Sequence, residues 1–347
     1  MRKFLQITVL LFLSIHTYSQ EKAGYEISVT ISDISDSTIF LAYHYGDRQY
    51  LSDTLKLDGK GQGIFKGKEK LPEGIYMIVL PGRKYFEFLM TDNQHFSLSC
   101  LYNDFFRTLK FSGSPLNTAF TDYQRQWSQM QQKASGIANR LQQNKANSDS
   151  LRILSGKQRE YESEMKAYLR TVAGKNSSNF LGVLVKSMIP LEIPEFSIPA
   201  GTNNPDSVRW YLRYNYNKDH FFDNIDLTDE RLLRTPILQA RLEVFFKNVI
   251  IQSPDSINKE IDRIFPKTGN NPKMFQFLSV FLFNHFRQSE IMGHDAVLVK
   301  LADDIYLSGK ADWITEEFRN DLHRQVELLR HNLLGMTAQN LVMDSYK

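Results

Sequence analysis

The chain has 347 residues, of which 42% are hydrophobic and 23% are charged. These shares are typical of globular proteins and exclude a largely disordered chain, while the length allows two or three domains. A formal net charge of +3 is too small to indicate a nucleic-acid-binding protein, so we expect no nucleic-acid partner.

Residues 1–19 are typical of a secretory signal peptide. Two basic residues precede an apolar stretch over residues 4–15, and the small residues Thr17 and Ser19 predict cleavage near Gln20. The stretch is short for a transmembrane helix, and an uncleaved N-terminal anchor is the alternative. We therefore expect export to the periplasm or cell envelope, association with the envelope surface, and no transmembrane helix after cleavage. Loss of the two basic residues would lower the net charge from +3 to +1.

The chain has one cysteine, Cys100. It can form no internal disulfide, and the chain contains no CxxC pair for thiol exchange. Because Cys100 lies in the alternating segment HFSLSC, we expect it to be a buried and unreactive core residue rather than a reactive or intermolecular thiol.

Residues 20–113 are predicted to form an antiparallel β-sandwich-like domain, since short β-branched and aromatic segments alternate with turn signals. The expected strands are YEISVTI (25–31), STIFLAYHY (37–45), GIFKGK (63–68), GIYMIVL (74–80), YFEFLM (85–90) and HFSLSC (95–100). The segment DGKGQG (58–63) lacks the Lys-Ser/Thr and the following helix of a phosphate-binding loop, so we expect a hairpin turn there.

Residues 114–175 are predicted to form a long helical hairpin. Two stripes of apolar residues recur at gaps of three and four and are separated by the polar segment QQNKANSDS. The alternative is that both stripes only pack against the later helices. The first stripe is Phe120, Tyr123, Trp127, Met130, Ala134, Ile137 and Leu141; the second is Leu151, Leu154, Tyr161, Met165, Tyr168 and Val172.

Residues 176–334 are predicted to form an all-α domain after a connector marked by prolines. Thr235 and Asn271 each precede a proline at an expected first helical position, and Thr315 precedes two glutamates. The segment KMFQFLSVFLFNHF is apolar nearly all round, so it is expected to be the central buried helix. The overall expectation is an α+β chain of two domains.

No catalytic, cofactor-binding or metal-ligating residue is predicted. His220 and Asp223 flank two phenylalanines in HFFDNIDL, which favours a hydrogen-bonded histidine in an aromatic core over a catalytic pair. Asp295 is expected to be a charge at a helix N-terminus, and Asp303 and Asp304 are expected to face solvent. His323 and His331 are too far apart on one helix to share a metal ion. No nucleophile elbow, dinucleotide loop or calcium loop is present, so we expect no enzyme and no cofactor.

Two sets of segments carry a family resemblance. DTLKLDGKGQGIFKGKEKLPEGIYMIVL resembles the DUF4369 domain of exported bacterial thiol-disulfide oxidoreductases of the TlpA/ResA type. The segments HFFDNIDLTDERLLRTPIL, PDSINKEID, NPKMFQFLSVFLFN and IMGHDAVLVKLADDIYLSGKADW resemble the DUF5106 domain that often follows it, although Phe222 stands where such segments usually carry Trp.

In that family the last helix leads into a thioredoxin-like domain, and residues 335–347 resemble its opening, with Gln339 in place of the usual Pro. The CxxC motif of that domain is absent here, so its redox activity transfers to no residue present.

The resemblance implies a non-catalytic exported envelope protein that acts as a binding or assembly module associated with a thiol-disulfide redox system. Its partner would be another protein or a second copy, bound through the helical hairpin. One alternative is the N-terminal part of a reductase whose CxxC domain lies beyond Lys347. Another is a glycan- or peptide-binding module that uses a β-sheet face, which clustering of exposed Tyr and Phe in one groove would indicate.

Overall fold

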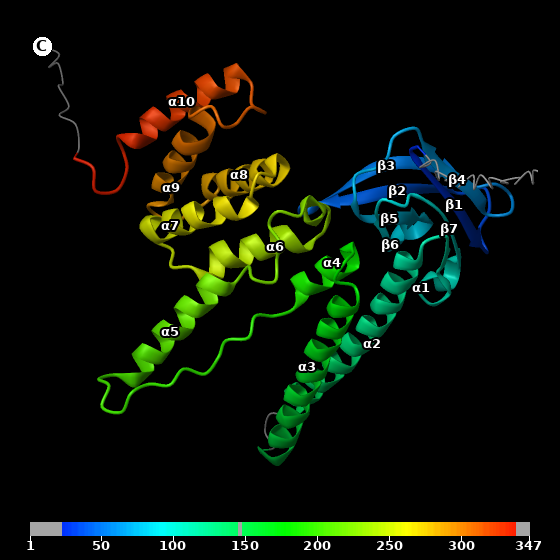
Figure 1. The fold of residues 1–347 in the computed structure, drawn as a ribbon, viewed down its shortest axis with the longest axis horizontal. Helices are drawn as coiled ribbons and strands as arrows, with labels where there is room; N and C mark the ends of the chain where they lie inside the picture. Colours follow the sequence, from blue (N-terminus) through cyan, green and yellow to red (C-terminus); the bar gives the residue numbers. More distant parts are fainter. Residues whose placement is uncertain (1–22, 145–147, 338–347) are drawn as a thin grey trace, which may run out of the picture.

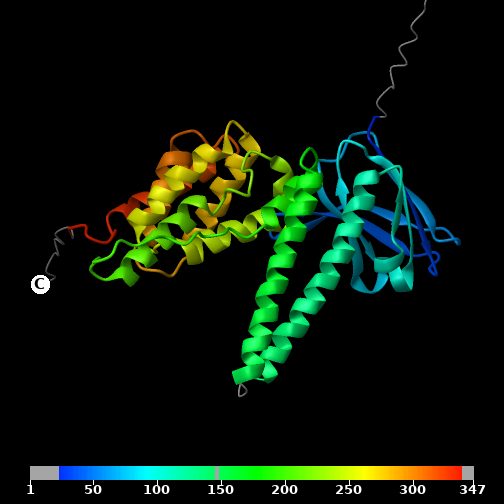
Figure 2. The same ribbon diagram turned by 60° about the horizontal axis from the view of Figure 1, so that its bottom comes forward.

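A computed structural model describes residues 23–144 and 148–337. Strands occupy one end, a group of short helices occupies the other, and a long two-helix arm projects from between them (Figures 1 and 2). The predicted α+β class, with a β-sandwich-like domain, a helical domain and a long hairpin, is confirmed. The predicted signal peptide, and residues 338–347 of the segment that resembles the opening of a thioredoxin-like domain, lie outside the described residues.

The strands form two four-stranded sheets, with orders β4-β1-β7-β8 and β3-β2-β5-β6. The sheets pack through apolar side chains that occupy alternate positions along each strand. In β1, Ile27, Val29 and Ile31 point into the space between the sheets and are at most 1% exposed. The strands are β1 (Tyr25–Ser32), β2 (Thr38–Tyr45), β3 (Arg48–Lys56), β4 (Gln62–Gly67), β5 (Gly74–Leu80), β6 (Lys84–Met90), β7 (His95–Leu101) and β8 (Lys110–Ser112).

Two details of the sandwich correct the sequence-based expectations. The sheets are not antiparallel throughout, because β1 pairs with β7 in parallel. The turn at Asp58 is not a hairpin, because β3 and β4 belong to different sheets. The Asp58 carboxylate accepts hydrogen bonds from the backbone N–H groups of Lys60 and Gln62, both at 2.8 Å, and so stabilises a sharp passage from one sheet to the other.

Two helices begin after the expected capping residues Asn271 and Thr315, whereas the helix expected after Thr235 begins at Ile237 and has Pro236 at its N-cap. Asn271 accepts hydrogen bonds from the N–H groups of Lys273 and Met274, and Thr315 accepts one from Phe318. The helices are α1 (Phe105–Thr108), α2 (Pro115–Gln143), α3 (Ser148–Lys175), α4 (Phe180–Met188), α5 (Pro205–His220), α6 (Ile237–Val244), α7 (Pro254–Ile264), α8 (Pro272–Arg287), α9 (His294–Leu301) and α10 (Glu316–Arg330). A 3-10 turn (Glu230–Arg234) precedes α6, and π-helical turns extend α6 (Phe245–Val249) and α9 (Ala302–Leu307).

The core of the helical domain is built around α8. Leu282 is fully buried and Phe286 is 2% exposed, which confirms α8 as a central helix, although Val280 on its other side is 38% exposed. Phe246 and Val297, from neighbouring segments, are also fully buried. One side of α8 therefore packs in the core and the other is left for a surface groove.

The two domains share one continuous packing region. Ile75 and Leu89 lie on the outer face of sheet β3-β2-β5-β6 and join the helical core with Phe120 of α2. The N–H of Gly46, at the β2–β3 turn, donates to the carbonyl of Leu233 at 3.0 Å. These contacts hold the sheet end against the helices.

Candidate functional site

One candidate site is a groove of about 700 Å³ between the β2–β3 turn and helices α6 and α8. This volume lies in the range of typical ligand sites. We call it the interdomain groove. It is lined by Tyr45, Asp47, Arg48, Tyr50, Gln239, Glu243, Lys247, Gln276, Phe277, Val280, Phe281, Asn284, His285, Arg287 and Gln288.

Aromatic rings form a continuous floor from the sheet to α8. The ring centroids of Tyr45 and Tyr50 are 6.3 Å apart. Tyr45 in turn meets Phe277 edge to face at 5.8 Å. Such an arrangement offers flat apolar area at a fixed position, which suits the backbone of a peptide or the face of a sugar ring.

The groove is lined by more positively than negatively charged side chains. Arg48, Lys247 and Arg287 oppose Asp47 and Glu243, and Lys247 Nζ lies 3.4 Å from Glu243 Oε2. Burial, together with the nearby Lys247, lowers the pKa of His285, so its ring is neutral at pH 7. The described residues that line the groove include no Ser, Thr or Cys.

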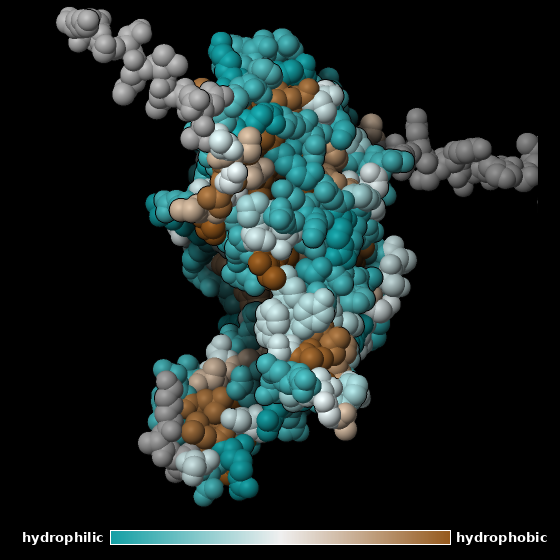
Figure 3. Space-filling model, turned by 90° about the vertical axis from the view of Figure 1, so that its left-hand side faces the viewer, coloured by the Kyte–Doolittle hydropathy of each residue, from teal (hydrophilic) through white to brown (hydrophobic). Residues whose placement is uncertain are grey.

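The second candidate surface is the arm formed by α2 and α3. At its base Phe120, Tyr123 and Met130 are buried, and Leu169 is the buried residue of α3. Between Met130 and Leu169, no side chain that the structure describes is fully buried. Hydrophobic residues gather on the visible face of the far end of the arm (Figure 3), and Ile153 is 55% exposed.

Cys100 is 5% exposed in the sandwich core, as predicted. Burial raises the pKa of its thiol to about 12. The predicted core position of His220 is wrong. This half-exposed residue ends α5, where its ring contacts Tyr216 and its Nδ1 lies 2.7 Å from Asp223 Oδ2. The terminus of a surface helix places it beside solvent, while Phe222 takes the buried position.

The carboxylates of α9 and its extension have structural roles. Asp295 lies in the first turn of α9, as expected, and Asp304 is exposed beside Lys300. Asp303 keeps 37% of its side chain exposed, in line with the expectation, and Arg330 of α10 binds it with two hydrogen bonds of 2.9 and 3.0 Å. Within the residues described, no three side chains of His, Cys, Asp or Glu, including those of His323 and His331, gather as a metal site requires.

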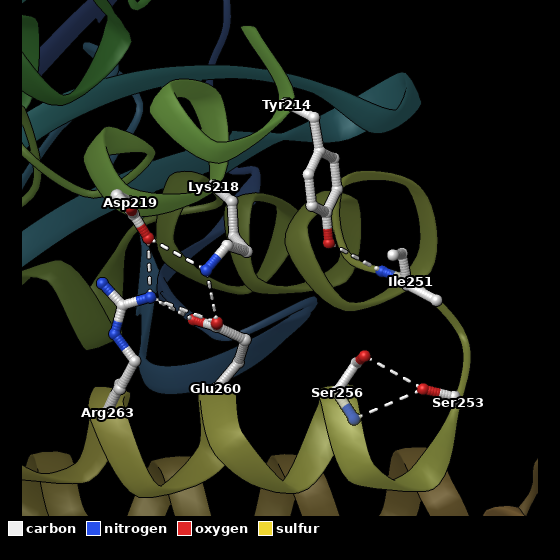
Figure 4. A network of polar contacts seen from close by, with 8 residues as sticks. All are labelled: Tyr214, Lys218, Asp219, Ile251, Ser253, Ser256, Glu260 and Arg263. Atoms are coloured by element: carbon white, nitrogen blue, oxygen red, sulfur yellow. Dashed lines mark hydrogen bonds and ion pairs between the residues drawn. The ribbon is translucent and has the colours of Figure 1, made fainter. Parts of the chain in front are cut away.

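A cluster of four charged residues fastens α5 to α7 (Figure 4). Lys218 Nζ lies 2.9 Å from Glu260 Oε1 and 3.0 Å from Asp219 Oδ1, and Arg263 bridges both carboxylates. Burial alone would lower the pKa of Lys218, but its hydrogen bonds to these carboxylates raise it. Since every member is paired and Glu260 is only 7% exposed, the cluster is a structural joint.

Sequence reasoning missed the interdomain groove. Its residues come from three separate segments, at 45–50, 239–247 and 276–288. The one local signal is Tyr45-Gly46-Asp47, a turn with polar and aromatic residues directly after an expected strand. Exposed aromatics do not all gather there, because Trp210 and Tyr211, each about 60% exposed, lie on α5.

No helix within residues 23–144 and 148–337 combines the length and apolarity needed to cross a bilayer.

Comparison with known families gives two matches. Residues 154–332 match the family described as Domain of unknown function (DUF5106), and residues 25–120 match Domain of unknown function (DUF4369). The DUF4369 match covers the sandwich and the start of α2, and the DUF5106 match covers most of α3 and the helical domain. No curated protein matches the chain.

Proposed function

The chain belongs to the DUF5106 family and carries a DUF4369 region before that domain. We propose that it is a non-catalytic exported envelope protein that serves as an assembly module of a thiol-disulfide redox system. Support for the redox association is the resemblance of its segments to those that precede thioredoxin-like domains. Support for export is the signal-peptide pattern of residues 1–19. An intact mass that begins near Gln20 would test the export step.

The observation that carries the assembly role is the projecting arm. Helices gain most of their stability in proteins by burying an apolar face, and two helices alone cover each other on one side only. Ile137 and Leu154 in the two apolar stripes are only half-buried, and Ile153 beside them is exposed. The arm therefore retains apolar surface that another pair of helices could bury.

The partner we propose for this surface is the arm of a second copy. Two hairpins would form a four-helix bundle, in which the stripes of both copies become core. Such a symmetric contact uses the same surface twice, as most homodimers do. The sandwich and the helical domain would then remain outside the bundle and free to contact other proteins.

Sedimentation velocity of the signal-cleaved protein over roughly 1–100 µM tests this role, because an associating protein changes its mean size with concentration. We expect a monomer–dimer equilibrium that Ile153→Lys shifts at least about tenfold toward monomer. The matched control is Asn139→Lys, which adds the same charge at an exposed position of α2 that carries no apolar side chain. A protein that stays monomeric throughout, or a dimer that Ile153→Lys leaves intact, contradicts the proposal.

A further inference from the structure

We propose that the interdomain groove binds an extended acidic peptide of a partner protein, whose backbone adds to the edge of strand β3. This goes beyond the assembly role of the arm and does not depend on it. Three features of the groove lead to this ligand: an open strand edge, unpaired side-chain amides and unpaired guanidinium groups.

Strand β3 is an open edge at the wall of the groove. It lies at the end of its sheet and pairs only with β2. Residues 48–51 are all exposed, including Tyr50 at 41% and Leu51 at 62%. An edge with free N–H and C=O groups and apolar side chains is a template for another strand.

The opposite edge of the same sheet shows how such an edge is closed. There the side-chain amide of Asn117 accepts a hydrogen bond from the N–H of Leu89 in β6 at 2.7 Å and donates one to its carbonyl at 2.9 Å. A side chain from α2 thus replaces a neighbouring strand. In the part of the chain that the structure describes, no side chain does the same for residues 48–52 of β3.

The floor and far wall of the groove fit a peptide in this position. Tyr45 and Phe277 supply apolar area below the edge. Across from it, the side-chain amides of Gln276, Asn284 and Gln288 have no hydrogen-bond partner among the described residues. Each amide can both donate to and accept from a peptide backbone, which suits an extended chain lying between β3 and α8.

The charges select an acidic peptide. Lys247 is paired with Glu243, whereas Arg48, Arg287 and Asp47 form no ion pair with any residue that the structure describes, so the unpaired groups carry one positive charge in excess. Guanidinium groups bind carboxylates in a planar two-point geometry, so two unpaired ones favour a ligand that carries Glu or Asp. The neutral His285 adds no charge of its own.

The test uses a fluorescein-labelled synthetic peptide of about ten residues, alternating threonine and glutamate, which spans roughly 33 Å when extended. We expect saturable binding by fluorescence anisotropy to the signal-cleaved protein. Substituting lysine for every glutamate in the peptide, or methylating alternate backbone nitrogens, should weaken binding at least about tenfold, since the first removes the charge match and the second the main-chain donors.

The protein variant is Arg48→Glu combined with Arg287→Glu, which should also weaken binding at least about tenfold. The control is Arg152→Glu combined with Arg159→Glu, which reverses two exposed charges on α3. Circular dichroism of each variant shows whether it is folded. Absence of binding to the wild type, equal binding of the lysine or methylated peptides, or binding of polygalacturonate in place of the peptide would overturn the proposal. Equal affinity in the Arg48 and Arg287 variant would overturn it too.

Discussion

Removing the amide of Asn117 should strongly destabilise the junction between the sandwich and the arm. Asn117 is 1% exposed in the first turn of α2, and its amide makes three hydrogen bonds. Two join it to the N–H and C=O of Leu89, at 2.7 and 2.9 Å, and the third joins it to Ser114 Oγ at 3.0 Å. Because β6 is an edge strand, no neighbouring strand can replace these bonds.

The magnitude follows from the two backbone groups that Asn117→Ala would leave without a partner. Leu89 is 1% exposed, so water does not reach them in the folded state. An unsatisfied buried polar group costs about 1–3 kcal/mol, so two such groups give a loss of about 2–6 kcal/mol in the free energy of unfolding. Thr118→Ala, at the exposed neighbouring position, should change it by less than about 0.5 kcal/mol.

Equilibrium urea unfolding followed by far-UV and near-UV circular dichroism measures the difference. Two probes are needed because the sandwich and the helical domain need not unfold in one transition. A loss below about 1 kcal/mol for Asn117→Ala, or an equal loss for Thr118→Ala, would refute the view that this amide closes the edge of β6.

Three further predictions follow from the same structure. With a thiol pKa of about 12, Cys100 should react with a disulfide reagent at pH 8 about a thousandfold more slowly in the native protein than in denaturant. The reaction rate of the native protein should still rise tenfold per pH unit at pH 10. Equal rates in the native and denatured protein would show an accessible thiol. Glu260→Ala should lower the free energy of unfolding, measured in urea, by about 1.5–3 kcal/mol, and the double variant Lys218→Met with Glu260→Leu should lower it by less than this single change. A double-variant loss equal to the sum of the two single-variant losses would argue against coupling between Lys218 and Glu260. Gly46→Ala should lower the free energy of unfolding by about 1–2 kcal/mol, because Gly46 has φ +61° and a Cβ there would meet Gln239 Oε1 at 2.4 Å. The control Gly59→Ala, whose Cβ would meet nothing within 4 Å, should be near neutral, and equal losses for the two variants would contradict this reasoning.

The fold class was predictable because its patterns are local. Ile27, Val29 and Ile31 alternate toward the core, and the caps Asn271 and Thr315 mark helix starts. The heptad stripes likewise predict the two helices of the arm. Each of these signals needs only neighbouring residues.

The features that sequence reasoning missed depend on contacts between distant segments. Strand β3 was not recognised because residues 48–51 are exposed on both faces, which leaves no alternation to detect. β1 pairs in parallel with β7 although strands of the other sheet lie between them in the chain, so no local pattern marks this pairing. The groove forms only when the β2–β3 turn meets α6 and α8, so no single segment announces it.

The most direct test of the assembly role is hydrogen exchange of the arm as a function of protein concentration. Amides exchange through local opening, so a new packing contact slows them. If two arms form a bundle, amides at 131–143 and 148–165 should become better protected as concentration rises, while those of β1 stay unchanged. The Ile153→Lys variant should lose this concentration dependence. Equal protection of these amides at every concentration of the wild type would contradict the account.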